Sequence, residues 1–556
     1  MIFHPPSWLP AIPEDLSKVG TVGEFVLRGP SSAQESATES KNPLVSADGT
    51  KRKSYRQLAE DVEALAAGLA QELQWSSNES AQGDMIIGIW SENTVDYHTY
   101  CFATHRLGGT SLVLHASTSS EENIRHLKAS NCSVLIVSPA LVEAGRAAAA
   151  ALRGLRVYLT ASLAEDSSSG FKTIEQLLES GRTLGPVPVL GKPCPIAYLC
   201  ATSGTSGAQK LARLTHSGII TNILQMNAVA SLSHNPAGEV ALGCLPFSHV
   251  QGLVAALSHI YLRDELIVHP TFDMKAVLMS IQVHRINRLY VVPAILAALV
   301  ANPFLFKAFD LSSVDKVLVG AGALAHGLYT RVKAAQPGWA ITVGYGLTES
   351  SVGVSLSSPH EYLPGSIGVL LPLYQARLVR EDGSEVEGFD EPGELLLASP
   401  NQAAGYLGDD EATATTFRDG WLHTGDVALF RQSPKGDAHL YIVDRLKDMI
   451  KVKGMQISPV AIEDCLRQHP GVVDVAVIGV PDYLAGERPK AFIVPAKKPA
   501  EGEVEALFDD WDEFVQSKLT ELHWLRGRYE LLEALPRTPS GKVTKGVLRR
   551  RQESKD

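Results

Sequence analysis

Cysteine is scarce in this chain of 556 residues, and no two cysteines have the spacing of a C-x-x-C pair. The six cysteines are scattered along the sequence, at Cys101, Cys132, Cys194, Cys200, Cys244 and Cys465. Such spacing offers no cysteine-ligated metal site, and it fits a protein of a reducing compartment.

Positive charge is also in deficit, because 50 lysines and arginines face 61 aspartates and glutamates, for a net charge of -11. This balance argues against a general nucleic-acid binder. The one basic run, at residues 549–551, is better explained as a solvated helix end than as a nucleic-acid patch.

Long apolar runs are missing, and none reaches the length needed to span a bilayer. The N-terminal MIFHPPSWLP lacks the basic and apolar pattern of a signal peptide. The final ESKD differs from the Ser-Lys-Leu peroxisomal address. We therefore expect a cytoplasmic protein with no membrane span.

The length of the chain predicts two or more domains, since one hydrophobic core does not grow to this size. Apolar residues at helical spacing predict a helix over residues 55–73. Between residues 85 and 160, short apolar segments alternate with helix-like ones, which predicts mostly parallel, doubly wound sheets. From residue 365 onward, alternating strands with Gly- and Asp-rich turns predict a smaller β-region. A strand–helix–strand pattern follows it.

Small hydroxyl residues and glycines follow a strand-like segment at residues 195–199. They are Thr202, Ser203, Gly204, Thr205, Ser206 and Gly207, and Lys210 comes soon after. Backbone N–H groups and hydroxyls in this position form a concave site suited to phosphate oxygens. A Walker A loop is excluded, because Lys210 lies between Gln209 and Leu211. For this stretch alone, a Ser/Gly-rich surface turn is the alternative.

Two further predicted strands, at residues 314–319 and 341–343, lead into glycine-bearing segments. These segments contain Gly320, Ala321 and Gly322, and then Gly344, Tyr345, Gly346, Leu347, Thr348 and Glu349. Strand ends that point the same way form the crevice where α/β sheets bind ligands. Glu349 is therefore a candidate Mg²⁺ ligand, since Mg²⁺ takes one or two carboxylates together with phosphate oxygens. His249, on a turn after Pro246, is by itself better explained as a structural histidine.

Five motifs occur in order along the chain: TSGTSGAQK, GYGLTES, GELLL…GYLGDDEATATTF…DGWLHTGD, YIVDRLKDMIKVKGMQISPVAIE and PRTPSGK. With them, the chain resembles the ANL superfamily of adenylate-forming enzymes from about residue 55 to residue 548. The likeness is strongest to the 4-coumarate–CoA ligase and luciferase-like branch. It implies an α/β fold with a large N-terminal AMP-binding domain, residues 1–445, of doubly wound α/β subdomains plus a small β-subdomain. It also implies a hinge at Lys447 and a small mobile α+β domain, residues 446–556.

The resemblance also implies which residues bind ATP. The matching positions are Thr202, Ser203, Gly204, Thr205, Ser206, Gly207, Lys210, Gly320, Ala321, Gly322, Gly344, Tyr345, Gly346, Leu347, Thr348, Asp426, Arg445, Lys447, Lys451 and Lys542. Within this set, Lys210 matches a contact to the β- and γ-phosphates, and Tyr345 matches the residue against the base. Asp426 and Arg445 match the residues that bind the ribose hydroxyls.

A second group matches the family's catalytic residues: Lys542, His249, Thr348, Glu349, Lys451 and Gln456. Lys542 matches the lysine that bridges the incoming carboxylate and the α-phosphate, and Glu349 matches the Mg²⁺ ligand. Lys453 and Gly454 match residues on the CoA side.

The acyl pocket that the resemblance implies consists of His249, Val250, Val254, Gly320, Gly346, Val352, Gly353 and Val354. His249 matches the gating aromatic residue or histidine of the family. Residues 248–254 contain no acidic side chain to hold a substrate ammonium group, which disfavours a free α-amino acid. An aromatic or medium-chain acid is expected.

The implied reaction uses ATP, Mg²⁺ and coenzyme A. A carboxylic acid becomes acyl-AMP with release of pyrophosphate, and the acyl group then moves to CoA. Two alternatives stay open: a non-CoA acceptor, such as a separate carrier protein or an amine, and a nucleotide-binding relative that has lost catalysis. The chain departs from the family at Gln209 and Leu211, which replace a Pro-Lys-Gly ending around Lys210, and at Val343, where glutamine is common.

Overall fold

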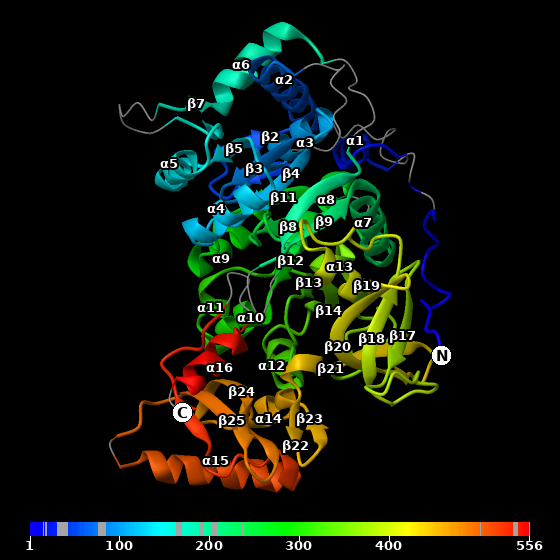
Figure 1. The fold of residues 1–556 in the computed structure, drawn as a ribbon, viewed down its shortest axis with the longest axis vertical. Coiled ribbons are helices and arrows are strands. Elements are labelled where there is room, and N and C mark those ends of the chain that lie inside the picture. The colour runs from blue at the N-terminus through cyan, green and yellow to red at the C-terminus, as the bar shows by residue number, and fades with distance from the viewer. Residues whose placement is uncertain are drawn as a thin grey trace.

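A computed structural model describes residues 1–14, 16, 19–30, 43–75, 85–162, 170–187, 194–202, 209–235, 238–500, 502–537 and 543–554. In this part of the chain the strands form four sheets. Figure 1 shows two α/β layers in the upper and middle parts, an antiparallel sheet beside them, and the C-terminal elements at the bottom. No described helix is both long enough and apolar enough to cross a membrane.

The first large sheet is mostly parallel, and its described strands lie in the order β7 (Lys172–Thr173), β6 (Arg156–Leu159), β5 (Val134–Val137), β3 (Ile86–Trp90), β4 (Thr110–Leu114), β8 (Ile196–Ala201) and β9 (Leu211–Thr215). Only the β8–β9 pair is antiparallel within this described sheet. Every residue of β3 and β4 is buried, which explains their continuous apolar sequences. The helices of this part are α2 (Tyr55–Leu73), α3 (Tyr97–Arg106), α4 (Ser120–Ala129), α5 (Val142–Ala151) and α6 (Ile174–Leu184).

The predicted helix over residues 55–73 is confirmed as α2. Ser54 precedes it and accepts a hydrogen bond from the backbone N–H of Gln57, while the Gln57 side chain accepts one from the backbone N–H of Ser54. This capping box fixes the start of the helix. The predicted alternation of strands and helices between residues 85 and 160 is confirmed as well.

The second large sheet has its described strands in the order β16 (Val369–Leu370), β15 (Val352–Leu356), β14 (Ala340–Leu347), β13 (Lys316–Val319), β12 (Arg288–Val291), β10 (Val240–Gly243), β11 (Glu265–Val268), β1 (Leu44–Ser46) and β2 (Arg52–Lys53). Its centre is parallel and both of its ends are antiparallel. The helices that accompany it are α1 (Val22–Arg28), α7 (His216–Ala230), α8 (Val250–Leu262), α9 (Met274–His284), α10 (Pro293–Ala301), α11 (Leu305–Ala308) and α12 (His326–Ala335).

Strand β14 is longer than the sequence predicts. It was expected to end at Val343 and runs on to Leu347. Its first half pairs in parallel with β13, and its second half pairs in an antiparallel direction with β15, with an irregularity between Tyr345 and Gly346. The glycine-bearing segment is therefore a strand that extends past the end of β13, because β15 supplies its hydrogen bonds.

The predicted smaller β-region is an antiparallel sheet of β17 (Gln375–Val379), β18 (Gly393–Ala398), β20 (Trp421–Gln432), β19 (Phe417–Arg418) and β21 (Ala438–Arg445). Helix α13 (Asp410–Thr416) precedes β19. The N-terminal segment closes one side of this sheet, where Phe3 stacks on Phe430 with ring centroids 3.9 Å apart.

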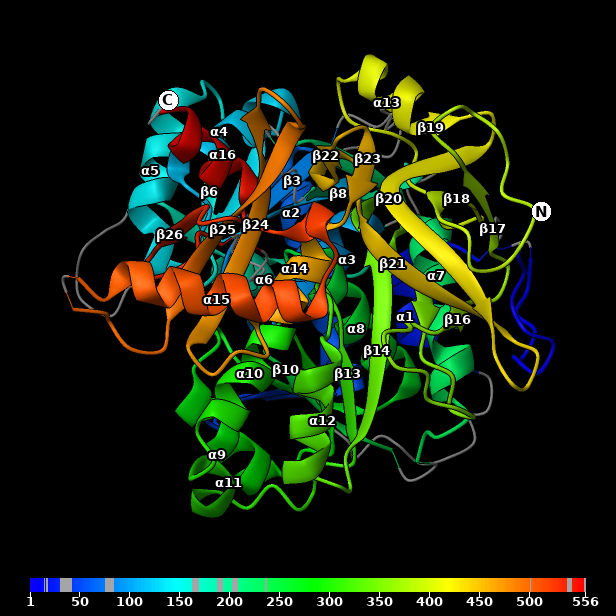
Figure 2. The same ribbon diagram turned by 90° about the horizontal axis from the view of Figure 1, so that it is seen from below.

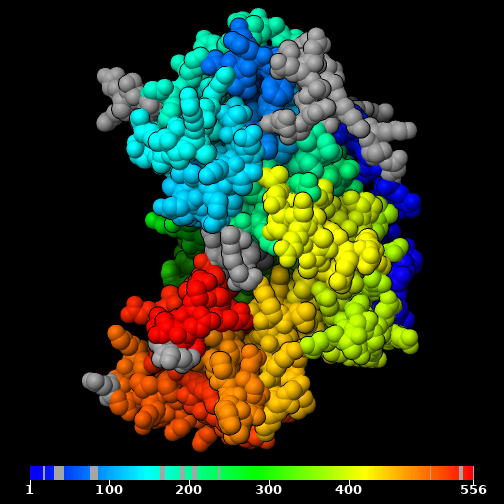
Figure 3. All heavy atoms as spheres, in the orientation of Figure 1, coloured from blue at the N-terminus to red at the C-terminus, as the bar shows by residue number. Residues whose placement is uncertain are grey.

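The C-terminal part has its own sheet and core. It consists of η4 (Leu446–Asp448), β22 (Ile450–Val452), β23 (Met455–Ile457), α14 (Pro459–Leu466), β24 (Val472–Asp482), β25 (Gly486–Pro495), α15 (Val504–Lys518), η5 (Glu521–His523), β26 (Tyr529–Leu531) and α16 (Lys545–Glu553). Figure 2 looks onto this part from below, with α15 toward the viewer. Trp511 of α15 is fully buried against the sheet. In Figure 3 the orange and red atoms of this part adjoin the yellow atoms of the smaller sheet.

The basic run at residues 549–551 lies on α16, as expected of a helix end. Arg549 forms an ion pair with Asp448 at 2.6 Å, and Arg551 forms one with Glu530 at 2.6 Å. Acidic partners already occupy these two guanidinium groups, so the run does not form a bare cationic patch.

Candidate active site

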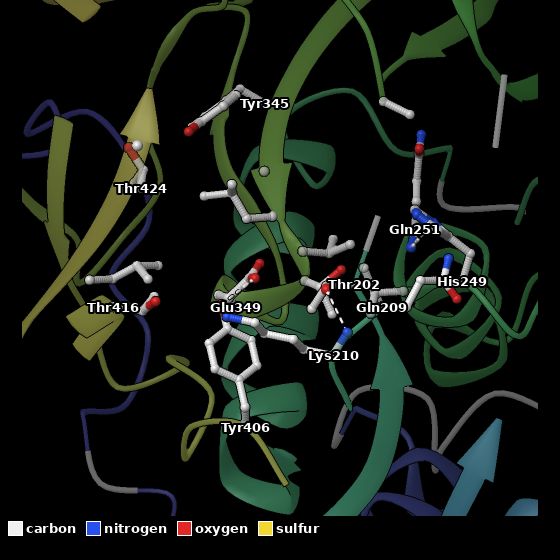
Figure 4. A pocket seen from close by; sticks show the side chains of 18 of the residues that line it. Thr202, Gln209, Lys210, His249, Gln251, Tyr345, Glu349, Tyr406, Thr416 and Thr424 are labelled. Carbon is white, nitrogen blue, oxygen red and sulfur yellow. Dashed lines mark hydrogen bonds between the residues drawn. The ribbon is translucent and has the colours of Figure 1, made fainter. Parts of the chain in front are cut away.

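One cavity of about 1070 Å³ lies where the carboxyl ends of the large sheets meet the smaller sheet and the start of the C-terminal part. It gathers many of the residues that the sequence singled out. The predicted residues that line it are Thr202, Lys210, His249, Val250, Gly320, Ala321, Gly344, Tyr345, Gly346, Leu347, Thr348, Glu349, Val352, Gly353, Arg445 and Lys447. Figure 4 shows this cavity from close by.

A buried carboxylate stands at one end of the cavity. Asp426 of β20 and Arg445 of β21 are register partners in the smaller sheet, and Arg445 Nε lies 2.6 Å from Asp426 Oδ1. The Tyr345 hydroxyl donates to Asp426 Oδ2 over 2.5 Å. Asp426 is buried behind these two side chains, which themselves line the cavity.

The electrostatics of this set follow from its burial. Burial and the Asp426 charge raise the pKa of Tyr345 well above its ordinary value, so its hydroxyl stays protonated and donates. Burial acts to lower the pKa of Arg445, but Asp426 and the other nearby acids outweigh that effect and raise it. Tyr345 therefore stays a neutral donor and Arg445 stays charged.

A second polar set stands near the middle of the cavity. The Tyr406 hydroxyl donates to Glu349 Oε1 over 2.7 Å, and Lys210 Nζ lies 5.1 Å from the centre of the Tyr406 ring. The same Nζ is 3.6 Å from Asp409 Oδ2. Burial and the Glu349 charge raise the pKa of Tyr406. A cation, a carboxylate and hydroxyl donors thus face one space.

Two hydrogen bonds join Thr202 and Lys210. Thr202 N–H donates to the Lys210 carbonyl over 2.8 Å, and Lys210 N–H donates to Thr202 Oγ1 over 3.4 Å. The intervening Ser203, Gly204, Thr205, Ser206 and Gly207 lie outside the described residues, as does Lys542.

Gly346 is required by a close approach of two strands. A Cβ at this position would stand 1.6 Å from the carbonyl oxygen of Val352 on β15. Any side chain here would separate β14 from β15, so the glycine fixes the wall of the cavity at that point.

Comparison with known proteins agrees with this geometry. The family model for AMP-binding enzymes matches residues 17–407, and that for the AMP-binding enzyme C-terminal domain matches residues 461–542. The chain belongs to the AMP-binding enzyme family. It is 44% identical to the acyl-CoA ligase easD of Emericella nidulans, over 99% of this chain and 100% of that protein. It is 39% identical to the acyl-CoA ligase cm3C of Cordyceps militaris, over 100% of this chain and 91% of that protein.

Solved structures share the fold of this AMP-binding enzyme. The anthranilate CoA ligase AuaEII in complex with anthranoyl-AMP is 23% identical and superposes with a TM-score of 0.83, over 96% of this chain and 97% of that chain. The amide bond synthetase McbA from Marinactinospora thermotolerans is 22% identical with a TM-score of 0.79, over 96% and 99% of the two chains. The expected ANL superfamily, and the expected large N-terminal part with a smaller C-terminal one, are confirmed.

Several predicted pocket residues of this AMP-binding enzyme lie away from the cavity. Val254 on α8 and Val354 on β15 are fully buried in the hydrophobic cores and do not line it. Gly322 follows the lining residues Gly320 and Ala321 but does not reach the cavity.

The predicted residues of the C-terminal part also lie elsewhere. Lys451 Nζ pairs with Glu381 Oε1 at 2.6 Å, and Gln456 Nε2 donates to Glu381 Oε2 over 2.9 Å. Lys453 Nζ lies 3.8 Å from Glu521 Oε1. Gly454 has open space around it.

Lys447 is the exception in this part, because it lines the cavity. Burial lowers the pKa of its ammonium group.

The structure adds cavity residues that the sequence reasoning did not single out. They include Tyr406 and Asp409, which follow β18, together with Met226 of α7, Gln251 of α8 and Leu318 of β13. Tyr406 and Asp409 were present in the quoted GYLGDDEATATTF motif, so a signal for them existed. For Gln251 the one sequence signal is its position two residues after the predicted pocket residue His249.

Proposed function

We propose that this AMP-binding enzyme activates a carboxylic acid with ATP, forming acyl-AMP and pyrophosphate, and then transfers the acyl group to the thiol of coenzyme A. One observation carries the proposal: a single cavity has Arg445 and Tyr345, with Asp426 buried behind them, at one place on its wall and the Lys210–Glu349 set at another. A nucleotide offers matching chemistry, with hydroxyls on its ribose and negative charge on its phosphates. Full-length similarity to acyl-CoA ligases supports the same reaction.

In this proposal Asp426 accepts hydrogen bonds from the two ribose hydroxyls, and Arg445 holds its carboxylate in place. Bonds of this kind are charge-assisted, because the carboxylate is ionised. Tyr345, on β14, packs against the base of the nucleotide. Thr202, Thr348 and Lys210 contact the phosphates through hydroxyls and a point charge.

Glu349 fits the role of a Mg²⁺ ligand. Its carboxylate lines the cavity. The hydrogen bond from the Tyr406 hydroxyl to Oε1 fixes the orientation of the carboxylate and thereby the direction of Oε2. Mg²⁺ prefers such oxygen ligands in combination with phosphate oxygens. Bound there, the ion would neutralise charge on the phosphates during transfer.

The chemistry explains why these groups are needed together. A carboxylate oxygen attacks the α-phosphorus of ATP, the bond to the bridging oxygen breaks, and pyrophosphate leaves. Negative charge develops on the transferring group and on the leaving oxygens, so positioning and cations supply most of the catalysis. Lys542, as in its superfamily, is proposed to bridge the carboxylate and the α-phosphate.

The thioester step is proposed to need a rotation of the C-terminal part. We propose a domain boundary between Arg445 and Leu446, with residues 1–445 and 446–556 as the two domains. Strand β21, which ends at Arg445, pairs with β20 of the smaller sheet, whereas β22 pairs with β25 of the C-terminal sheet. A turn at Lys447 would withdraw Lys542 and bring Lys453 and Gly454 toward the CoA side. This is a hinge motion of the kind that many enzymes use.

The substrate is proposed to be an aromatic or medium-chain acid, because Met226, Leu318, Val352 and Leu356 give the cavity an apolar wall. A non-CoA acceptor is the second candidate. The fold shared with an amide bond synthetase favours testing it, since one fold then serves both acceptors.

The test combines purified protein, Mg²⁺ and ATP with a panel of aryl and fatty acids, with and without CoA, and reads the products by mass spectrometry. Acyl-CoA that forms only when CoA is added supports the proposal. Acyl-AMP that accumulates whether or not CoA is present supports the adenylation step of the proposal and indicates a carrier protein or an amine as acceptor. The absence of any adenylate across the panel overturns the proposal.

Two variants test the role of Lys542 in the same assay. Lys542→Ala should lower the rate of acyl-AMP formation by roughly 100- to 1000-fold, as for loss of one oxyanion-stabilising donor. Lys498→Ala, at an exposed lysine of the same C-terminal part, should leave the rate unchanged. Full adenylation by Lys542→Ala would remove that residue from the mechanism.

A further inference from the structure

Gln251 lines the cavity, and its side chain carries an unused hydrogen-bond donor. Gln251 is the second residue of α8, directly after the helix N-cap His249 and Val250. Its Nε2 atom is buried and has no hydrogen-bond partner among the described residues. An amide NH₂ group carries two N–H donors, and leaving them unpaired in a buried place is costly.

The amide is held at a defined place on the wall. A Cβ added at Gly320 would stand 2.6 Å from Gln251 Nε2 and 3.5 Å from Oε1, so the plane of the amide lies against the Gly320 backbone at the end of β13. Figure 4 shows Gln251 beside His249, on the side of the cavity away from Thr416 and Thr424. It therefore stands at the acyl end of the proposed site.

None of the described residues accepts a hydrogen bond from this donor, and part of the cavity wall is unable to do so. Met226, Leu318, Val352 and Leu356 are apolar. The Ser355 hydroxyl is engaged, because it donates to the Ile367 carbonyl over 3.0 Å. An unpaired amide group beside apolar side chains is an arrangement that orients an uncharged ligand through a small number of polar contacts.

We propose that Gln251 Nε2 donates a hydrogen bond to a neutral oxygen of the acyl group, which makes the substrate an oxygenated acid that carries a hydroxyl, keto or ether oxygen. This inference rests on the proposed acid activation and narrows its substrate class. The amide is uncharged and offers no counter-charge, so a second carboxylate on the substrate is disfavoured. A plain hydrocarbon acid would leave the amide unpaired in the complex.

The experiment compares matched acids that differ by one oxygen. Octanoic acid is set against its 2-, 3- and 4-hydroxy and 3-oxo derivatives, and benzoic acid against its three monohydroxy isomers. ATP–pyrophosphate exchange gives kcat/KM for acyl-AMP formation. We expect at least one oxygenated acid to exceed its plain parent by about tenfold, the effect of one neutral hydrogen bond.

Variants then assign the preference to the amide. Gln251→Leu leaves a side chain of similar volume and removes the amide donors, and it should bring both acids of the preferred pair to the same kcat/KM. Gln251→Glu replaces the donor with an acceptor of the same shape and should lower kcat/KM for the oxygenated acid further. The matched control is Gln209→Leu, which removes an amide beside Lys210 in the same cavity and should leave the ratio between the two acids intact.

Three results overturn the inference. Equal activation of plain and oxygenated acids by the unaltered enzyme would do so, and so would a preference that survives in Gln251→Leu. A preference lost to the same degree in Gln209→Leu would show that the amide of Gln251 is not its source. In each of these cases acyl-AMP still forms, which separates failure of this inference from failure of the proposed function, in which no acid is activated.

Discussion

Asp426 shows how one side chain joins burial to binding. Its carboxylate holds the Arg445 guanidinium and the Tyr345 hydroxyl at once, and it is buried in the smaller sheet. A buried carboxylate keeps its charge only when partners such as these offset the hydration free energy that it loses on burial. The same charge makes it a strong acceptor for a ligand hydroxyl.

The substitution Asp426→Asn should raise KM for ATP by about 10- to 100-fold, the worth of a charge-assisted hydrogen bond of roughly 1.5–3 kcal/mol. Pyrophosphate exchange at varied ATP concentration measures this. The matched control is Asp390→Asn, which removes an exposed carboxylate paired with Arg431 of β20 at 2.7 Å. An unchanged KM in Asp426→Asn would exclude the ribose-binding role.

His98 makes the fold sensitive to acid. It is fully buried on α3 beside Phe247 and Phe102, and its two ring nitrogens have no hydrogen-bond partner among the described residues. Burial lowers the pKa of its imidazole to about 3. The unfolded chain binds a proton near pH 6.5 while the folded one does not, so stability falls as the pH drops from 6.5 toward 3.

At pH 5 this one histidine should cost about 2 kcal/mol of the free energy of unfolding relative to pH 7 or above. Urea unfolding of the unaltered protein and of His98→Leu at both pH values measures the effect. The loss of stability between pH 7 and pH 5 should be smaller in His98→Leu. His326→Leu, at an exposed histidine at the start of α12, serves as the control and should keep the full acid sensitivity. Equal acid sensitivity in His98→Leu would contradict the assignment.

At the scale of elements, strand β14 decides the shape of the site. It changes partner from β13 to β15 along its length, and Gly346 lies at the irregularity between its register positions. The close approach of the Val352 carbonyl leaves no room for a Cβ there.

We expect Gly346→Ala to lower the free energy of unfolding by about 1–3 kcal/mol or more, because β14 and β15 must move apart. A drop in Tm, measured by calorimetry, checks it. The control is Gly327→Ala on α12, where nothing lies within 4 Å of the added Cβ and the helix gains about 0.5–1 kcal/mol. A Tm for Gly346→Ala equal to that of the unaltered protein would show that β14 and β15 move apart at no cost in stability, which would contradict the prediction.

At the scale of the whole molecule, Glu381 ties the two parts together. It stands after β17 of the smaller sheet and binds both Lys451 and Gln456 of the β22–β23 hairpin. Lys451 and Gln456 match residues that complete the superfamily's catalytic site, and in this structure they are held away from the cavity. Both side chains of the ion pair are more than half exposed, so the link is weak.

We expect Glu381→Gln to release the C-terminal part and to speed adenylation relative to thioester formation by up to about fivefold, the effect of an exposed pair worth up to 1 kcal/mol. Single-turnover measurements of the two half-reactions give this ratio. Glu385→Gln removes a carboxylate of the same sheet that pairs with Arg377 and should leave the ratio unchanged. A slower adenylation step in Glu381→Gln would mean that the contact aids this step, which would contradict the prediction.

Local pattern determined much of this protein. Helix α2, the buried strands of the first sheet and the strand–helix–strand order of the C-terminal part follow from spacing and turn residues within a few positions of one another. The motifs predicted the family for the same reason, since a loop that holds a phosphate needs its glycines and hydroxyls in sequence.

Tertiary structure decided the rest, because those features depend on residues far apart in the chain. Val254 and Val354 have the apolar character of a pocket wall, and only the packing of α8 and β15 turns them into the core instead. Gln251 contacts Gly320, Tyr406 contacts Glu349, and Glu381 contacts Lys451, and more than 50 residues separate the two partners in each case. Such meetings are fixed by sheet order and register, so the sequence determined which chemistry is present and the fold decided which groups share the cavity.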